Sequence, residues 1–102
     1  MEKTIAGKTV AVNEEGYLTD QSQWTKEVAE AIAGEEGIDL TQRHWEVIAY
    51  LQDQHKQGVA LSIRKIGKSG VIDIKEFYQL FPNGPLKIST KIAGIPKPAS
   101  CI

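Results

Sequence analysis

Glycine and proline divide this chain into short segments in which apolar residues recur at helical spacing. Trp24, Val28 and Ile32 follow one another in steps of four, which places them on one face of a helix. The signals that bound this helix are the capping residues Asp20 or Ser22 before it and Gly34 and Gly37 after it. Because such breaks recur along the chain, the sequence predicts short helices that pack on one another to bury their apolar faces.

Four more helices are predicted after the first. The second runs from Thr41 to about Gly58, with Leu40 placed to pack on Trp45, and a short third carries Leu61, Ile63 and Ile66 and ends at residues 68–70. The fourth opens with Asp73 in a capping box and stops at residues 82–84. The last runs from Pro85 to about Ile92.

The first twenty residues predict β structure instead. Residues 3–5 and 9–12 flank Ala6-Gly7-Lys8, a glycine-containing hairpin loop, and residues 16–18 are a candidate for a further extended piece. A chain of 102 residues has a core for one domain only. We therefore expect a mainly α fold, a small bundle of four to five short helices with an N-terminal β-hairpin, in a single domain of residues 1–94.

Residues 95–102 are expected to form a mobile, extended C-terminal arm. Pro96 and Pro98 fix φ and remove two backbone donors, which excludes a regular helix and favours a stiff, extended chain. The arm carries Cys101, the only cysteine of the sequence. One thiol can form neither an internal disulfide nor a multi-cysteine metal site, and His44 and His55 are too far apart on one helix to share a metal ion. The sequence therefore predicts neither a metal site nor a cofactor.

The residues alone leave two interpretations of Cys101 open. It is either an incidental surface thiol near the chain end or a thiol on a semi-rigid stalk that reaches into the active site of a partner. Lys97, together with Lys87 and Lys91, would favour the thiolate, whereas the carboxylate of Ile102 would oppose it.

The net charge of −1 conceals two opposed halves. Residues 1–53 contain four Lys or Arg against 11 Asp or Glu, a charge of −7, and residues 54–102 contain eight against two, a charge of +6. The basic run Arg64, Lys65 and Lys68 favours an acidic partner or nucleic acid, so a helix-turn-helix-like DNA-binding protein is one alternative. Apolar stretches are too short for a membrane span or a signal peptide, which predicts a cytoplasmic protein that does not enter a membrane.

Motifs along nearly the whole chain closely resemble the DsrC/TusE family, which comprises the gamma subunit associated with dissimilatory sulfite reductase and a sulfur-relay protein of tRNA thiolation. They are Gly16-Tyr17-Leu18, Gln23-Trp24, Glu36-Gly37-Ile38, His44-Trp45-Glu46-Val47, Ile63-Arg64, Phe81-Pro82-Asn83-Gly84-Pro85 and the run Lys91-Ile92-Ala93-Gly94-Ile95-Pro96-Lys97-Pro98 with the penultimate Cys101. The resemblance implies that Cys101 carries sulfur as a persulfide, as in a sulfurtransferase that acts only with partner proteins.

The resemblance also implies the partners. These are an upstream sulfur-relay donor and a downstream tRNA 2-thiouridylase, with indirect contact to tRNA. Family members with a second cysteine eleven positions before the last one serve sulfite reductase, and Thr90 stands at that position here. The single-cysteine relay protein is therefore favoured, and a gamma subunit or regulator of sulfite reductase is the alternative. The residues expected to position the arm or dock the partner are Arg64, Lys87, Lys91, Pro96, Lys97 and Pro98.

Overall fold

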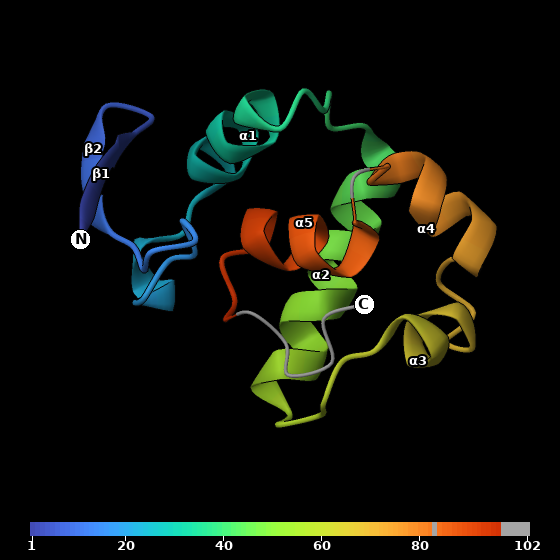
Figure 1. The fold of residues 1–102 in the computed structure, drawn as a ribbon. Coiled ribbons are helices and arrows are strands. Elements are labelled where there is room, and N and C mark those ends of the chain that lie inside the picture. Colours follow the sequence, from blue (N-terminus) through green and yellow to red (C-terminus); the bar gives the residue numbers. More distant parts are fainter. Residues whose placement is uncertain (83, 97–102) are drawn as a thin grey trace.

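The computed structural model describes residues 1–82 and 84–96. Within these residues a β-hairpin is followed by one 3₁₀-helix and five α-helices (Figure 1). Their bounds are β1 Glu2–Ile5, β2 Lys8–Ala11, η1 Gln21–Gln23, α1 Lys26–Glu35, α2 Gln42–Lys56, α3 Ile63–Gly67, α4 Ile74–Leu80 and α5 Pro85–Ile92. The predicted fold class, a small bundle of short helices with an N-terminal hairpin, is confirmed.

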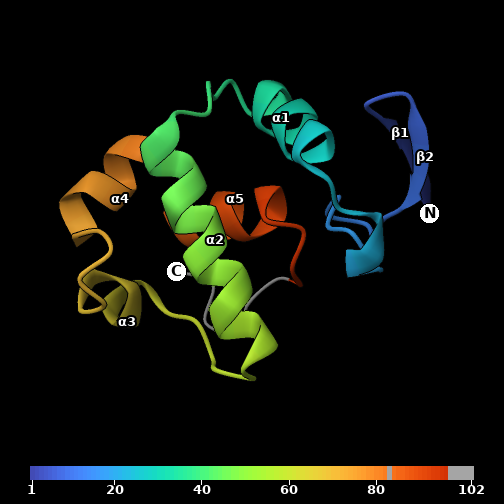
Figure 2. The same cartoon turned by 180° about the vertical axis from the view of Figure 1, so that it is seen from behind.

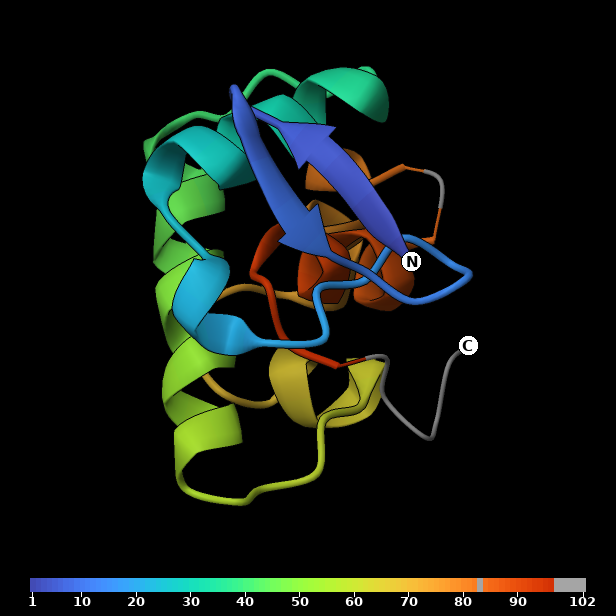
Figure 3. The same ribbon diagram turned by 90° about the vertical axis from the view of Figure 1, so that its left-hand side faces the viewer.

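Helix α5 lies at the centre of the bundle. It contacts α1, α2 and α4, and six of its eight residues are buried. Figure 1 shows α5 in front of α2, Figure 2 shows α2 in front when the molecule is seen from behind, and Figure 3 shows the hairpin packed over the opposite end of the bundle from α3. Everything that follows α5 in the chain therefore starts from the best-buried element of the fold.

The hairpin loop is shorter than predicted. β1 pairs with β2 in antiparallel register from Glu2 opposite Ala11 to Ile5 opposite Lys8, so Lys8 belongs to the strand and the three-residue loop was wrong. The turn is Ala6-Gly7, with φ of 52° and 77°. A two-residue turn with both residues left-handed matches the twist of the strands it joins. The predicted extended piece is confirmed by a bridge from Val12 to Leu18.

The first helix begins later than predicted. Asp20 does cap a helical turn, because its side chain accepts from the Ser22 N–H, but that turn is the short η1. The chain is then extended at Trp24, and α1 starts at Lys26 with Thr25 as its N-cap. Placing Trp24 inside the helix was therefore wrong. Its position ahead of α1 leaves its indole free to contact α5.

His44 is a capping residue, as its place in the first turn of α2 predicts. Its Nδ1 accepts a hydrogen bond of 3.0 Å from the Thr41 N–H, so Nε2 carries the proton and donates to the Leu80 carbonyl at 3.0 Å. The ring also meets the edge of Phe81. The imidazole thus joins the start of α2 to the end of α4, a structural role.

A guanidinium clamp joins the same two helices. Arg43 on α2 donates to both carboxylate oxygens of Glu76 on α4, at 3.0 and 2.6 Å, and to the Val71 carbonyl at 3.0 Å. It also donates to Glu46, one turn further along α2, at 3.2 Å. The capping box predicted at Asp73 is therefore half formed: Asp73 accepts from the Glu76 N–H, while the Glu76 carboxylate binds Arg43.

Replacing the clamp carboxylate, Glu76→Gln, should destabilise the fold at neutral pH and not in acid. The hydrogen bonds from Arg43 lower the pKa of Glu76. Its charge therefore stabilises the fold above the pKa of the unfolded chain, and this contribution is lost as pH falls through the lower pKa of the folded protein. Urea unfolding between pH 7 and about pH 3 should show the variant and the parent converging in acid. Glu14→Gln removes an exposed carboxylate as the control and should follow the parent throughout. A difference that stays constant with pH would contradict the clamp.

Candidate functional site

The thiol itself lies outside the described residues, together with Lys97 and Pro98 of the predicted arm. The structure does describe the base of the arm, which we define as residues 92–95, and Pro96, which is exposed. Ile95, the first residue of the predicted arm, is buried, with 1% of its surface exposed. The body of the protein thus includes Ile95, and the candidate site is built from what holds this segment.

Helix α5 ends in a backbone arrangement that only glycine fits well. Gly94 has φ of 73°, its N–H donates to the Lys91 carbonyl at 3.2 Å, and the Ile95 N–H reaches back to the Thr90 carbonyl at 3.2 Å. This pair of bonds is the Schellman motif, which turns the chain sharply away from the helix axis. A Cβ at Gly94 would also lie 2.4 Å from Cδ1 of Trp24. Both backbone and neighbour therefore demand glycine here.

Two side chains from distant parts of the chain hold the carbonyls of the arm base. The indole N–H of Trp24 donates to the Ile92 carbonyl, and the Gln52 amide of α2 donates to the Ala93 carbonyl, each at 2.8 Å. The last carbonyls of a helix have no partner within the helix, so they are bound here instead of being left unsatisfied. The point from which the arm leaves is fixed in direction.

Thr90 occupies the buried side of α5. Its side chain is fully buried, and its hydroxyl donates to the Leu86 and Lys87 carbonyls at 2.7 and 3.1 Å. Tyr17 adds a hydrogen bond of 2.9 Å to the same Lys87 carbonyl. The hydroxyl of Thr90 is thus a packing and backbone-satisfying group, and it offers no thiol chemistry.

The basic residues predicted to act with the arm do not form one cluster. The Lys91 ammonium is held by Glu36 at 3.1 Å, and its Cε lies close to the position a Cβ at Gly16 would take. Lys87 is exposed on α5, whereas Arg64 is exposed on α3. Lys91 is therefore engaged in an ion pair between α5 and the end of α1.

Sequence reasoning missed Trp24, Gln52 and Gly94 as the residues that define the arm base. Gln23-Trp24 and Gly94 did stand among the family-like motifs, but residue type gave no reason to connect them across the chain. Gln52 carried no signal at all, because a glutamine on a helix face is ordinary. Only the tertiary structure brings the three together.

Neither a metal centre nor a membrane segment is found in the part of the chain that the structure describes. No group of three or more His, Cys, Asp and Glu side chains there could hold a metal ion. Within residues 1–82 and 84–96, no helix has the length and apolar character needed to cross a membrane.

The described part of the chain is a small helical body whose last helix ends in a firmly held turn, and the comparisons identify its family. Residues 4–102 match the family described as DsrC-like protein. Sulfurtransferase TusE of Escherichia coli K12 is 40% identical, and that of Salmonella typhimurium 39%, each comparison covering 94% of this chain and 95% of the relative.

Solved structures show the same fold. A chain in the crystal structure of dissimilatory sulfite reductase I has a TM-score of 0.86 at 36% identity. The gamma subunit of the dissimilatory sulfite reductase (DsrC) from Archaeoglobus fulgidus has a TM-score of 0.81 at 38% identity. Both comparisons cover 100% of each chain. The chain belongs to the DsrC-like family, and the resemblance drawn from its motifs is confirmed.

Gly94→Ala should destabilise the protein strongly. It combines the cost of a left-handed backbone at a residue with a Cβ, about 1–2 kcal/mol, with a clash against Trp24. Gly34→Ala is the matched control, because Gly34 lies within α1, is exposed and has open space around it. That change should stabilise by roughly 0.5–1 kcal/mol. Urea unfolding of both variants measures the contrast, and equal effects of the two would refute the special role of Gly94.

Trp24→Phe should test the hydrogen bond separately from the packing. The phenyl ring retains most of the apolar surface but leaves the Ile92 carbonyl without its 2.8 Å donor. We expect a loss of about 1 kcal/mol in the free energy of unfolding. Amide hydrogen exchange should also be faster at the Ile95 N–H, whose bond belongs to the same helix end. Protection of Ile95 equal to the parent's would show that the indole does not hold the arm base.

Proposed function

We propose that this chain is a sulfur carrier that accepts sulfur as a persulfide on Cys101 and passes it to a partner protein. The observation that carries the proposal is the family match over residues 4–102, which includes the thiol. The relatives that support it are sulfurtransferases by name and align with 94% of the chain. Cys101 is the only residue of the sequence that can form a persulfide.

The transfer follows from thiol chemistry. The Cys101 thiolate attacks the outer sulfur of a donor persulfide, a new S–S bond forms, the donor's own S–S bond breaks, and the donor leaves as a thiolate. The reverse arrangement passes the outer sulfur from Cys101 to an acceptor thiolate. No electron is gained or lost overall, so neither step requires a cofactor. We propose that groups in the partner's pocket, and not in this chain, donate and accept the protons in these steps.

The single thiol supports a relay over a redox role. An internal disulfide, or a sulfur held between two cysteines, needs a second thiol in the chain, and the corresponding position is Thr90, whose hydroxyl is spent on backbone carbonyls. We therefore favour a tRNA 2-thiouridine-type relay in the cytoplasm, between an upstream sulfur donor and a thiouridylase that contacts tRNA. A sulfurtransferase of this kind acts only with those partners.

The likeness to a chain of dissimilatory sulfite reductase I supports a second candidate. In this role the body would bind a sulfite reductase, and the step at Cys101 would again be exchange of the outer sulfur of a persulfide with a thiolate, without an internal bridge. The two candidates share the persulfide on Cys101 and differ in the partner. DNA binding through Arg64 and its neighbours stays a prediction, and its measurement is binding to a duplex at low salt.

The fixed arm base supports delivery of the thiol. Bonds from Trp24 and Gln52 hold the last turn of α5, and Pro96 and Pro98 reduce the number of states open to the arm. Less conformational entropy is then lost when Cys101 enters a partner. Arg64, Lys87 and Lys97 would dock the partner or stabilise anionic sulfur, and Lys91 would act through its ion pair with Glu36.

Intact-mass spectrometry tests the carrier. Protein isolated without reductant from cells of its source organism should carry the added mass of one sulfur atom, removable by a thiol reductant. Cys101→Ser should carry none. The sharper control is the double variant Glu14→Cys/Cys101→Ser, which moves the only thiol to an exposed position on the body and should stay unmodified in the same cells.

Two results would oppose the proposal. Absence of added sulfur on the parent, in cells whose other sulfur carriers are loaded, would remove the carrier role. Equal loading of the relocated thiol would show that Cys101 is an incidental surface thiol, because its place on the arm would then confer nothing.

A further inference from the structure

A groove runs between α1 and α2. It is made of three adjoining pockets with volumes of about 360, 520 and 280 Å³. Glu30 and Trp45 line both the first and the second pocket, and Trp24, Ala49 and Gln52 line both the second and the third. Because they share these side chains, the three pockets adjoin one another along α2, and we call them together the groove.

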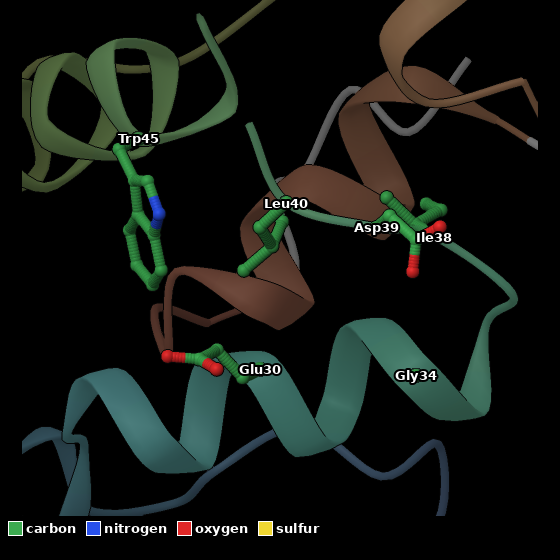
Figure 4. Close-up of a pocket in the computed structure, with 6 residues that line it drawn as sticks. All are labelled: Glu30, Gly34, Ile38, Asp39, Leu40 and Trp45. Atoms are coloured by element: carbon green, nitrogen blue, oxygen red, sulfur yellow. The ribbon is translucent and has the colours of Figure 1, made fainter. Parts of the chain in front are cut away.

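Both tryptophans of the chain line this groove, and they differ in the hydrogen bonding of their indole N–H groups. The Trp24 indole N–H is bound to the Ile92 carbonyl. Trp45 projects from α2 toward α1, with Leu40 beside it and Glu30 facing it from α1 (Figure 4). Its ring is half-buried, and within the described residues its N–H has no hydrogen-bond partner. A half-buried indole with a free donor is the kind of surface that anchors binding partners.

The Trp45 end of the groove is negatively charged. Glu30 and Asp39 line the first pocket without a cationic side chain, whereas Lys26 and Lys56 line the second and third. Neither carboxylate has an ion pair or hydrogen bond in the part of the chain that the structure describes. The neighbouring acids differ, because Glu35 is paired with Lys3 and Glu36 with Lys91. The fold thus neutralises the acids at the end of α1 and leaves Glu30 available beside the Trp45 ring, with Asp39 beyond Leu40 (Figure 4).

We propose that the groove docks an arginine-bearing segment of a partner protein. A guanidinium stacks on the face of an indole and donates to a carboxylate, so Trp45 and the Glu30 that faces it fit its chemistry (Figure 4). Asp39, beyond Leu40 in the same pocket, adds negative charge. An apolar residue next to the arginine enters the wider part of the groove, which Ile48 and Ala49 line. The charge of −7 on the half of the chain that builds this groove attracts a basic segment over distance.

The groove is physically continuous with the arm base. Trp24 and Gln52 form its wall and also hold the Ile92 and Ala93 carbonyls. A segment bound in the groove therefore contacts the side chains that fix the exit of the arm. On this ground we assign the groove to the protein that exchanges sulfur with Cys101, and this identification of the partner rests on the proposed function, whereas the binding of an arginine segment does not.

Nuclear magnetic resonance of the full chain tests the docking. The probe is the blocked pentapeptide Pro-Leu-Arg-Leu-Pro, and its control has citrulline, which has the same shape without the charge, in place of arginine. The chain has two indole N–H signals, and Trp24→Phe assigns them. The Trp45 signal should shift saturably with the arginine peptide, and rising salt should weaken the effect.

Charge-neutral variants locate the binding. Glu30→Gln combined with Asp39→Asn should weaken binding of the arginine peptide roughly fivefold, because it removes one exposed ion pair and the added negative charge of Asp39. Glu27→Gln removes an exposed carboxylate from the same helix outside the groove and should leave the affinity unchanged. Equal binding of the arginine and citrulline peptides, equal affinity of the double variant and the Glu27 control, or no saturable shift of Trp45 would each overturn the proposal.

The two proposals fail separately. Intact-mass spectrometry measures sulfur on Cys101, and the nuclear magnetic resonance signal of the Trp45 indole measures peptide binding. Loss of the first with the second intact contradicts the carrier and not the groove, and the reverse result contradicts the groove alone.

Discussion

The hydrogen bond from the Trp24 indole to the Ile92 carbonyl is the interaction on which the functional end of the molecule depends. It closes a helix terminus that would otherwise present bare carbonyls, and it brings the indole so near to Gly94 that no other residue fits there. Gln52 completes the same cradle from α2. Because α5 is buried on most of its surface, strain at this end cannot be relieved by moving the helix. The direction in which the chain leaves the body is thus built into the core.

The helices could be predicted from the sequence wherever the cap and the apolar period coincided. Thr41, Asp73 and Pro85 each stand at a helix start, since a capping side chain or a proline has a local reason to be there. The start of α1 could not be predicted, because Asp20 is an equally good cap and the choice of Thr25 depends on η1. That short helix is tied to β2 through the Gln23 side chain, which exchanges hydrogen bonds with the backbone of Ala11. This is a tertiary constraint that no local pattern contains.

The residues of the candidate site also fall into those that the sequence suggests and those that only the folded structure brings together. Cys101 is proposed from its position, because a lone thiol beyond two prolines is unusual by itself, and it lies outside the described residues. The residues that hold the arm base were not found, since Trp24 and Gln52 meet the end of α5 only after folding. Lys91 pairs with Glu36, because the end of α1 lies beside α5. Its role beside the thiol stays a prediction, and the sequence neighbours gave no sign of the partner that the fold brings to it.

The separation of charge along the chain survives folding in part, and this bears on how a carrier meets two proteins. Lys91 of the basic half pairs with Glu36 of the acidic half and cancels charge between the halves. The pair of Arg43 with Glu76 joins the minority charges of the two halves and does not reduce the separation. Other charges remain at a distance from each other: Glu30 and Asp39 along the groove, and Arg64, Lys65 and Lys68, all exposed, on and after α3. In the proposed carrier role, a donor and an acceptor bind in turn. Surfaces of opposite sign would let one small body distinguish them, because a partner steered to one surface is repelled by the other.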